Sequence, residues 1–175
     1  MRSLFLLPLV GLAVSAQAQF NVRVQIAGNV TTVSDNGTIQ FNADAIGKPV
    51  DAVVSITNRG TGTINIIRYE QTGATDFTTG GVPAPEVAIL PNDGFSMNVK
   101  FTPTSGTRAT GLMRLGFTDT PPANPPGQRT TNGTLTLNLA GVAPEYTFTY
   151  LPPPAANSTP IVAGGTIAFP ATTVN

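Results

Sequence analysis

The 175-residue sequence contains no cysteine, no histidine and no tryptophan, and only 10% of its residues are charged. Without cysteine the chain cannot form disulfide bonds or thiolate metal sites. Without histidine it lacks the usual general base and the commonest ligand of transition metals. Nucleophilic catalysis by a Ser-His-Asp or Cys-His set is therefore excluded.

The sequence also lacks an excess of charge of either sign. Nine Lys and Arg residues balance nine Asp and Glu residues. Loss of Arg2 with the leader described below changes this balance to eight against nine, which is still close to neutral. Such a chain has no electrostatic field that attracts nucleic acid or anionic lipid, so we expect no nucleic-acid partner.

The first residues have the pattern of a signal peptide. Met1-Arg2 is a short positive start, Leu4 to Val14 is an apolar run, and Ala16-Gln17-Ala18 has the small-x-small form that signal peptidase cleaves. We predict a signal peptide over residues 1–18, cleaved after Ala18, with an uncleaved anchor or a buried strand as the alternative. The apolar run is shorter than the ~20 residues of a membrane span. No other apolar stretch is long enough, so we expect a mature chain without a membrane span that is secreted, periplasmic or at the cell surface.

From Phe20 onward, apolar residues alternate with polar ones, which is the period of a half-buried β-strand. The 18 glycines and 16 prolines suit short strands separated by turns. The runs that predict a buried face are Ile39 and Phe41; Val54 and Ile56; Ile64 and Ile66; Phe95, Met97, Val99 and Phe101; Met113, Leu115 and Phe117; and Leu135, Leu137 and Leu139. A shorter strand is predicted over Glu86 to Leu90. No helical period extends over a useful length, so the chain is all-β.

Turn-forming sequences separate these runs. Asn58-Arg59-Gly60, Pro91-Asn92-Asp93-Gly94 and Thr104-Ser105-Gly106 each contain a residue able to take positive φ. About seven strands with one apolar face each are best buried as two facing sheets. We therefore predict an immunoglobulin-like, antiparallel β-sandwich over residues 37–142, preceded by an N-terminal strand and lead-in over residues 19–36.

Several short motifs follow one another within residues 37–142. They are GTIQF; Asn58 and Gly60 of TNRG; Leu90, Pro91 and Gly94 of LPNDG; Val99, Phe101 and Pro103 of VKFTP; and Leu139 with Gly141 of LAG. In this order they resemble the ASH or Hydin-type immunoglobulin-like domain, a PapD-like or MSP-like sandwich that is abundant in bacterial choice-of-anchor D proteins. The resemblance implies the fold and a bacterial source, and it implies no activity. Independently of it, Asn58 is expected to satisfy free backbone groups at the end of a strand.

The GTIQF motif returns late in the chain. GTIQF begins at Gly37 and GTIAF at Gly165, which is 165 − 37 = 128 residues later. We predict that residues 165–175 are the opening strand of a truncated second repeat of a longer protein, joined by a Pro-rich linker over residues 143–164; coincidence is the alternative. Burial of three apolar side chains contributes at most ~9 kcal/mol, whereas ordering eleven residues costs at least ~11 kcal/mol. The segment therefore either adds to the first module as a strand or stays unattached.

Candidate catalytic and metal-binding residues are few. Lys48 and Lys100 are not preceded by the S-x-x-K pattern of a Ser-Lys dyad, and the single carboxylates are spread along the chain. Asp35-Asn36-Gly37 and Asn92-Asp93-Gly94 have oxygen ligands for calcium but not the spacing of a calcium loop, so we interpret both as turns. We predict no catalytic, cofactor-binding or metal-binding residue.

Candidate contact surfaces are more numerous. Tyr146, Phe148 and Tyr150 share one face and can stack on a sugar or a partner, or pack on a neighbouring module. The Pro-rich stretch Thr118 to Gly133 is predicted to be a long loop, either for recognition or as passive length variation. Glycan-acceptor patterns occur at Asn29, Asn36, Asn132 and Asn157, which are simply Thr-rich sequence if the source is bacterial.

These observations favour an exported, non-enzymatic immunoglobulin-like repeat module. We expect it to act as a structural spacer or as a surface that contacts proteins, cell-surface glycans or neighbouring repeat modules. One alternative is an accessory domain of a longer secreted enzyme whose catalytic part is outside this chain. Another is a PapD-like periplasmic chaperone, in which Arg23 or Lys100 would bind the carboxylate of a client.

Overall fold

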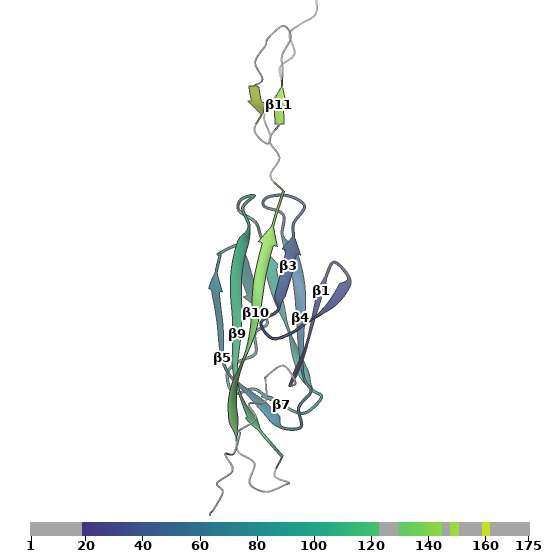
Figure 1. Cartoon of the computed structure of the whole chain (residues 1–175), viewed down its shortest axis with the longest axis vertical. Helices are drawn as coiled ribbons and strands as arrows, with labels where there is room; N and C mark the ends of the chain where they lie inside the picture. Colours follow the sequence, from purple (N-terminus) through teal and green to yellow (C-terminus); the bar gives the residue numbers. More distant parts are fainter. Residues whose placement is uncertain (1–18, 123–129, 145–147, 151–158, 162–175) are drawn as a thin grey trace, which may run out of the picture.

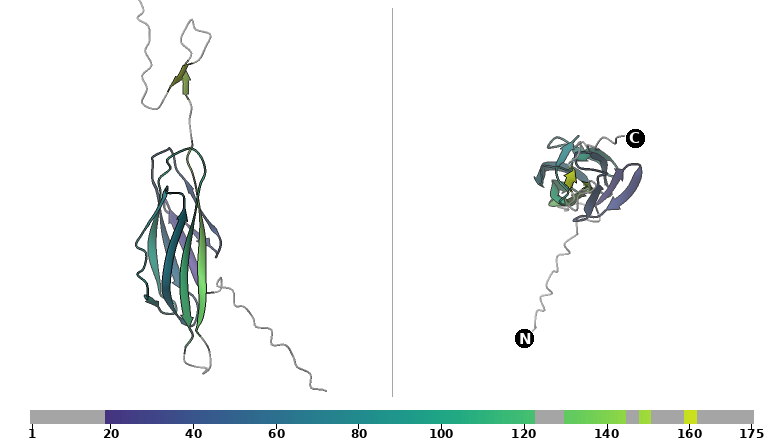
Figure 2. Two further views of the ribbon diagram at one scale, coloured as in Figure 1. Left: turned by 90° about the vertical axis from the view of Figure 1, so that its left-hand side faces the viewer. Right: turned by 90° about the horizontal axis from the view of Figure 1, so that it is seen from above.

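The computed structural model describes residues 19–122, 130–144, 148–150 and 159–161, and these contain strands and no helix (Figure 1). One sheet has the order β2 (Asn29–Val33), β1 (Phe20–Ile26), β4 (Val50–Asn58), β8 (Gly94–Phe101) and β6 (Phe77–Gly80). The second has the order β3 (Thr38–Asn42), β10 (Thr131–Val142), β9 (Ala109–Thr120), β5 (Thr63–Gly73) and β7 (Ala88–Ile89). The two sheets pack face to face as a sandwich, which is clear when the molecule is turned about its long axis (Figure 2).

The predicted all-β sandwich is confirmed, and it differs from the prediction in two respects. It has ten strands instead of about seven, because the predicted N-terminal strand and lead-in contribute β1 and β2 to the sandwich and because β6 is too short to show an alternating pattern. One strand pair is parallel: β3 lies beside β10, with Ile39 opposite Leu139. The chain crosses from the first sheet to the second between β2 and β3, and β3 then runs in the same direction as β10.

Strands also occur in two segments that were predicted as a lead-in and a linker. In the lead-in, β1 pairs with β4 from Phe20 opposite Asn58 to Ile26 opposite Ala52. The stretch predicted as a linker contains a small hairpin of β11 (Phe148–Tyr150) and β12 (Thr159–Ile161). The predicted signal peptide and the predicted second repeat lie outside the described residues.

Two predictions about local structure were wrong. The loop predicted from Thr118 to Gly133 is shorter, because its Thr-rich ends belong to β9 and β10 and pair with each other. The strand predicted over Glu86 to Leu90 has only the two residues of β7. The prolines at positions 85 and 91 cannot donate to a ladder, and Glu86 takes a positive φ of 70°.

The core consists of the side chains that the alternating pattern selects. Met97, Val99 and Phe101 of β8 are buried, and Phe95 at the start of this strand is half-buried. Three phenylalanine rings pack between the sheets. The ring centroid of Phe41 in the second sheet lies 5.7 Å from that of Phe77 and 5.9 Å from that of Phe101, both in the first sheet. The packing leaves no space beside Gly141 of β10, where an added Cβ would overlap the Phe101 ring. This contact explains why glycine occupies this position of the LAG motif.

Asn58 is the one fully buried polar side chain in the part of the chain that the structure describes. Its Nδ2 donates to the backbone oxygen of Gly62 at 2.8 Å and to that of Ile89 at 3.1 Å. Its Oδ1 accepts from the backbone N–H of Gly60 at 2.9 Å. Since Asn58 ends β4 and Ile89 belongs to β7, one amide links an end of the first sheet to the second, and the predicted role of Asn58 is confirmed.

A second set of polar contacts closes one side of the sandwich, between β5 and β6. The Tyr69 hydroxyl donates to Thr79 Oγ1, Thr79 donates to Gln71 Oε1, and Gln71 Nε2 donates to the backbone oxygen of Phe77, at 2.9, 2.9 and 2.8 Å. We call Tyr69, Gln71 and Thr79 the polar clasp. Partial burial raises the pKa of the Tyr69 phenol above its ordinary value of 10.0, and the hydrogen bond to Thr79 offsets only part of this rise.

Replacement of Asn58 by alanine should lower the free energy of unfolding by about 3 kcal/mol, because the buried backbone oxygens of Gly62 and Ile89 and the partly buried N–H of Gly60 lose their partner. Asn58→Asp keeps the acceptor for Gly60 but loses both donors, so it should also destabilise the protein. The measurement is chemical denaturation followed by circular dichroism, with Asn98→Ala on the exposed face of β8 as the control. Equal stability of the Asn58→Ala and Asn98→Ala variants would contradict this role.

Gly141→Ala should destabilise the sandwich by about 1–3 kcal/mol, because the added methyl group forces the buried Phe101 ring to move. Gly80→Ala is the matched control, since nothing lies within 4 Å of the added Cβ in β6. Thermal unfolding of both variants measures the difference. If the two variants unfold at the same temperature, the close contact with Phe101 is not a constraint.

The polar clasp predicts a loss of stability in alkali. The fold holds the neutral phenol of Tyr69, so its pKa is higher in the folded than in the unfolded chain. The resulting stabilisation is complete below the pKa of the unfolded chain and is lost as the pH rises through that of the folded chain. Titration of phenolate absorbance should show one of the three tyrosines ionising last. Tyr69→Phe should remove this component; its persistence would refute the assignment.

Candidate interaction groove

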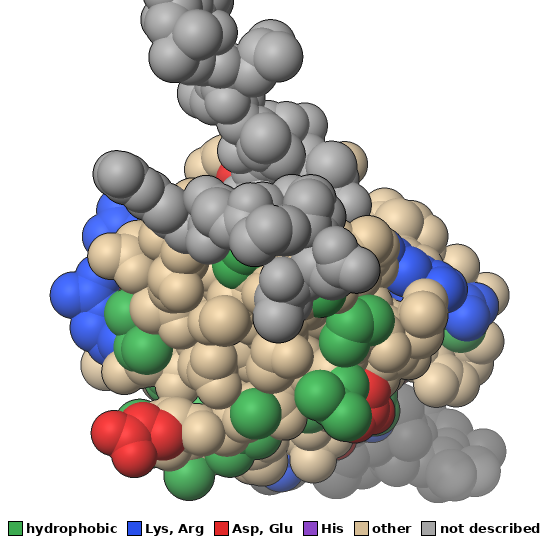
Figure 3. All heavy atoms as spheres, turned by 90° about the horizontal axis from the view of Figure 1, so that it is seen from below, with side chains coloured by type: hydrophobic (Ala, Val, Ile, Leu, Met, Phe, Trp, Pro, Cys, Tyr) green, Lys and Arg blue, Asp and Glu red, His purple; other side chains and the backbone are tan. Residues whose placement is uncertain are grey.

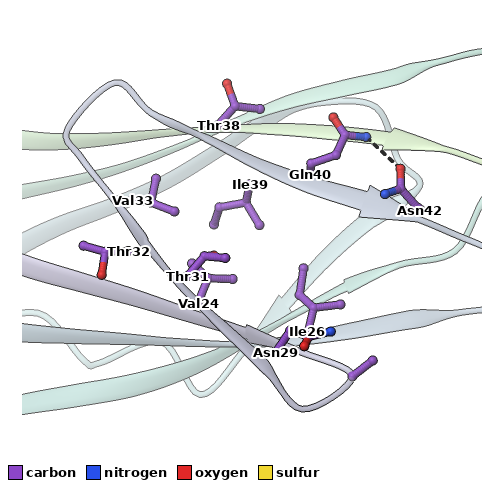
Figure 4. Close-up of a pocket in the computed structure, with 11 residues that line it drawn as sticks. Val24, Ile26, Asn29, Thr31, Thr32, Val33, Thr38, Ile39, Gln40 and Asn42 are labelled. Atoms are coloured by element: carbon purple, nitrogen blue, oxygen red, sulfur yellow. Dashed lines mark hydrogen bonds between the residues drawn. The ribbon is translucent and has the colours of Figure 1, made fainter.

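The side of the sandwich opposite the polar clasp is open. There the edge strands β2 and β3 border a groove of about 440 Å³ (Figure 4). Its apolar floor comes from Val24, Ile26, Val33 and Ile39. Threonine, asparagine and glutamine side chains form its rim, and its lining contains neither a charged nor an aromatic residue.

Local sequence explains why β2 leaves the body of the sandwich. Ala27 and Gly28 form a two-residue turn between β1 and β2, both with positive φ (48° and 83°), which is the backbone of a type I′ hairpin. Opposite Val24 lies Thr31, and opposite Val22 lies Val33, so these β2 residues share the inner face of the hairpin. No hydrogen bonds of the described strands join β2 to β3, and each strand has one edge free.

The Asp35-Asn36-Gly37 segment, considered above for calcium, is the turn that joins these two edges. The Asp35 Oδ1 accepts the backbone N–H of Thr136 at 2.7 Å, and the Asn138 Nδ2 donates to the backbone oxygen of Asn36 at 2.6 Å. Asn36 takes a positive φ of 60°. The segment therefore ties the β2–β3 connection to β10 and holds one end of the groove.

The other candidate for calcium, Asn92-Asp93-Gly94, also forms a turn. Asp93 Oδ1 accepts the backbone N–H of Gly94 at 2.8 Å, and Asn92 has a positive φ of 65°. The backbone N–H of Asn92 donates to the backbone oxygen of Asn58 at 2.8 Å, so this turn helps to hold the residue that carries the buried amide. Within the described ranges no three Asp or Glu residues come together in an arrangement that holds a metal ion.

The structure does not gather the charged candidates into a reactive site. Lys100 forms an exposed cross-strand pair with Asp51 at 3.8 Å, and exposed pairs of this kind contribute little. Arg23 is exposed on β1, where it lies opposite Ser55 of β4 and Thr32 of β2. Figure 3 shows the end of the sandwich where β9 and β10 are joined, with the basic and acidic side chains in separate small groups.

Other sequence-based candidates remain apart from the groove or outside the described residues. Asn36 and Asn132 are exposed, and Asn29 lies on the rim of the groove. Asn157 and Tyr146 are outside the described residues, and Phe148 and Tyr150 belong to β11. The part of the chain covered by the structure holds no helix that is both long and apolar enough to cross a membrane.

The groove was not predicted from the sequence. Its one local signal is the absence of charge in NVTTV and TIQFN, because edge strands commonly carry charged residues that prevent pairing. The signal becomes visible only once these segments are known to be edges. The sequence also did not predict that two buried carboxylate oxygens, Oδ1 of Asp76 and Oδ1 of Asp119, have no hydrogen-bond partner. Asp76 lies in the turn before β6, and Asp119 lies in β9.

No protein-family profile and no curated protein matches the chain. Among solved structures, it is similar to the ASH/PapD-like domain 7 of human CEP192, at 13% identity and a TM-score of 0.43, covering 83% of this chain and 98% of that one. It is also similar to the N-terminal domain of PorA, at 19% identity and a TM-score of 0.36, covering 70% of this chain and 96% of that one. A third similar structure is WR4, an MSP family member of C. elegans, at 9% identity and a TM-score of 0.36, covering 60% of this chain and 92% of that one. At these scores the likenesses carry no argument about activity or partners. They include a domain of the ASH/PapD-like class that the sequence motifs resemble.

Proposed function

We propose that this protein is an exported, non-enzymatic immunoglobulin-like module that contacts other proteins through the groove between β2 and β3. The observation that supports this proposal is the contrast between the two sides of the sandwich. On one side the polar clasp joins the two sheets, whereas on the other side the edge strands β2 and β3 border an uncharged groove with an apolar floor. The export of the module rests on the signal-peptide pattern of residues 1–18.

The chemistry of the groove favours a protein partner over a glycan. Sugar-binding surfaces commonly use aromatic rings for stacking, and the groove lining has none. Two free strand edges instead offer backbone N–H and C=O groups that an extended peptide can pair with. The apolar floor accepts alternate side chains of such a peptide, as the opposite face of a strand stays in water.

Binding to a phage-displayed library of random peptides tests this proposal. Mature protein, residues 19–175, should enrich uncharged peptides in which apolar residues alternate. Thr31→Lys places a charge on the inner face of β2 and should weaken binding at least about tenfold, because a buried charge without a partner is costly. Thr78→Lys on β6, also an exposed edge strand, is the matched control and should bind normally.

Two results would contradict the proposal. One is equal binding by the Thr31→Lys and Thr78→Lys variants, which would place the contact elsewhere on the module. The other is binding to purified cell-wall glycan that Thr31→Lys leaves unchanged, together with no selection of peptides.

A further inference from the structure

We propose that the groove binds the chain's own segment Gly165–Val174 as an added strand. This inference rests on the proposed function in so far as it takes the groove as a docking surface for an extended peptide. It adds the identity of the occupant. An external partner would then have to displace this segment.

The sequence of the segment suits the floor of the groove. GTIAF repeats GTIQF, the sequence that leads into and forms β3, where Ile39 and Phe41 are buried and Gln40 between them is exposed. By the same alternation, a strand formed by GTIAF has Ile167 and Phe169 on one face and Ala168 on the other. The apolar face matches the apolar floor of the groove.

The backbone edges and the charges also match. An added strand can pair with the free edge of β3. The sequence after Glu145 contains no charged residue, and neither does the groove lining. A charged peptide would lose hydration there without gaining a counter-charge, whereas this segment carries no such cost.

The chain between β10 and the segment is long enough. Phe148 is paired with Ile161 in the β11–β12 hairpin, so the hairpin brings the two ends of the connection together. The remaining spacers, residues 143–147 and 162–164, are crossed in 148 − 142 = 6 and 165 − 161 = 4 Cα–Cα steps, which together span up to about 33 Å. β3 is about 17 Å long and has Asn42 opposite Val142. A tether of this length gives a high effective concentration, which favours the chain's own segment over that of a second copy.

The absence of cysteine makes disulfide trapping a clean test in the full mature chain. Ala168→Cys is combined in turn with Thr38→Cys, Gln40→Cys and Asn42→Cys, whose side chains lie on the exposed face of β3. Neighbouring strands place paired residues within disulfide reach. Mild oxidation should form a disulfide within one chain in at least one combination, seen as a mobility shift of the monomer on a non-reducing gel.

The control pairs Ala168→Cys with Asn98→Cys, which is exposed on the outer face of β8, and this pair should not form a disulfide above background. Adding Ile167→Asp to the reactive pair should abolish the disulfide, because the charge cannot enter the apolar floor. Reaction of all pairs at the rate of the control would overturn the inference, and so would disulfide-linked dimers without the monomer shift. A negative result here with groove-dependent peptide selection would leave the proposed function intact. A positive result without peptide selection would leave only the chain's own segment as the ligand.

Discussion

The buried amide of Asn58 links the end of one sheet to the other, and the arrangement of the sandwich depends on this contact. Its Nδ2 satisfies backbone oxygens of Gly62 and Ile89, while its Oδ1 binds the N–H of Gly60. Without the amide the two oxygens would be buried and unpaired, and the partly buried N–H of Gly60 would lose its acceptor. One side chain therefore joins the connection between β4 and β5 to β7.

The two sides of the sandwich differ in how closely the sheets are joined. Between β5 and β6 the polar clasp joins the sheets through side-chain hydrogen bonds. Between β2 and β3 the sheets separate, because the β1–β2 hairpin stays with the first sheet while β3 joins the second. The difference places the two edge strands β2 and β3 on either side of an uncharged groove.

The buried faces of the strands could be predicted because alternation is a local property. Leu135, Leu137 and Leu139 form a continuous buried row, as their spacing indicates. The extent of each strand could not be predicted in the same way. Thr118 and Asn132 read as loop residues until the pairing of β9 with β10 makes them strand partners, because ladder hydrogen bonds join residues that are distant in sequence.

The sequence by itself determined the class of the fold, the buried face of each long strand and the exclusion of thiol and imidazole chemistry, since all of these follow from composition and a two-residue period. It also determined the turn at Asn92, where a residue tolerant of positive φ was required. Only the tertiary structure decided which strands lie at the edges, that β3 runs parallel to β10, and that the groove beside it is open. Edge status depends on which strand pairs with which, and no local pattern in the chain records that choice.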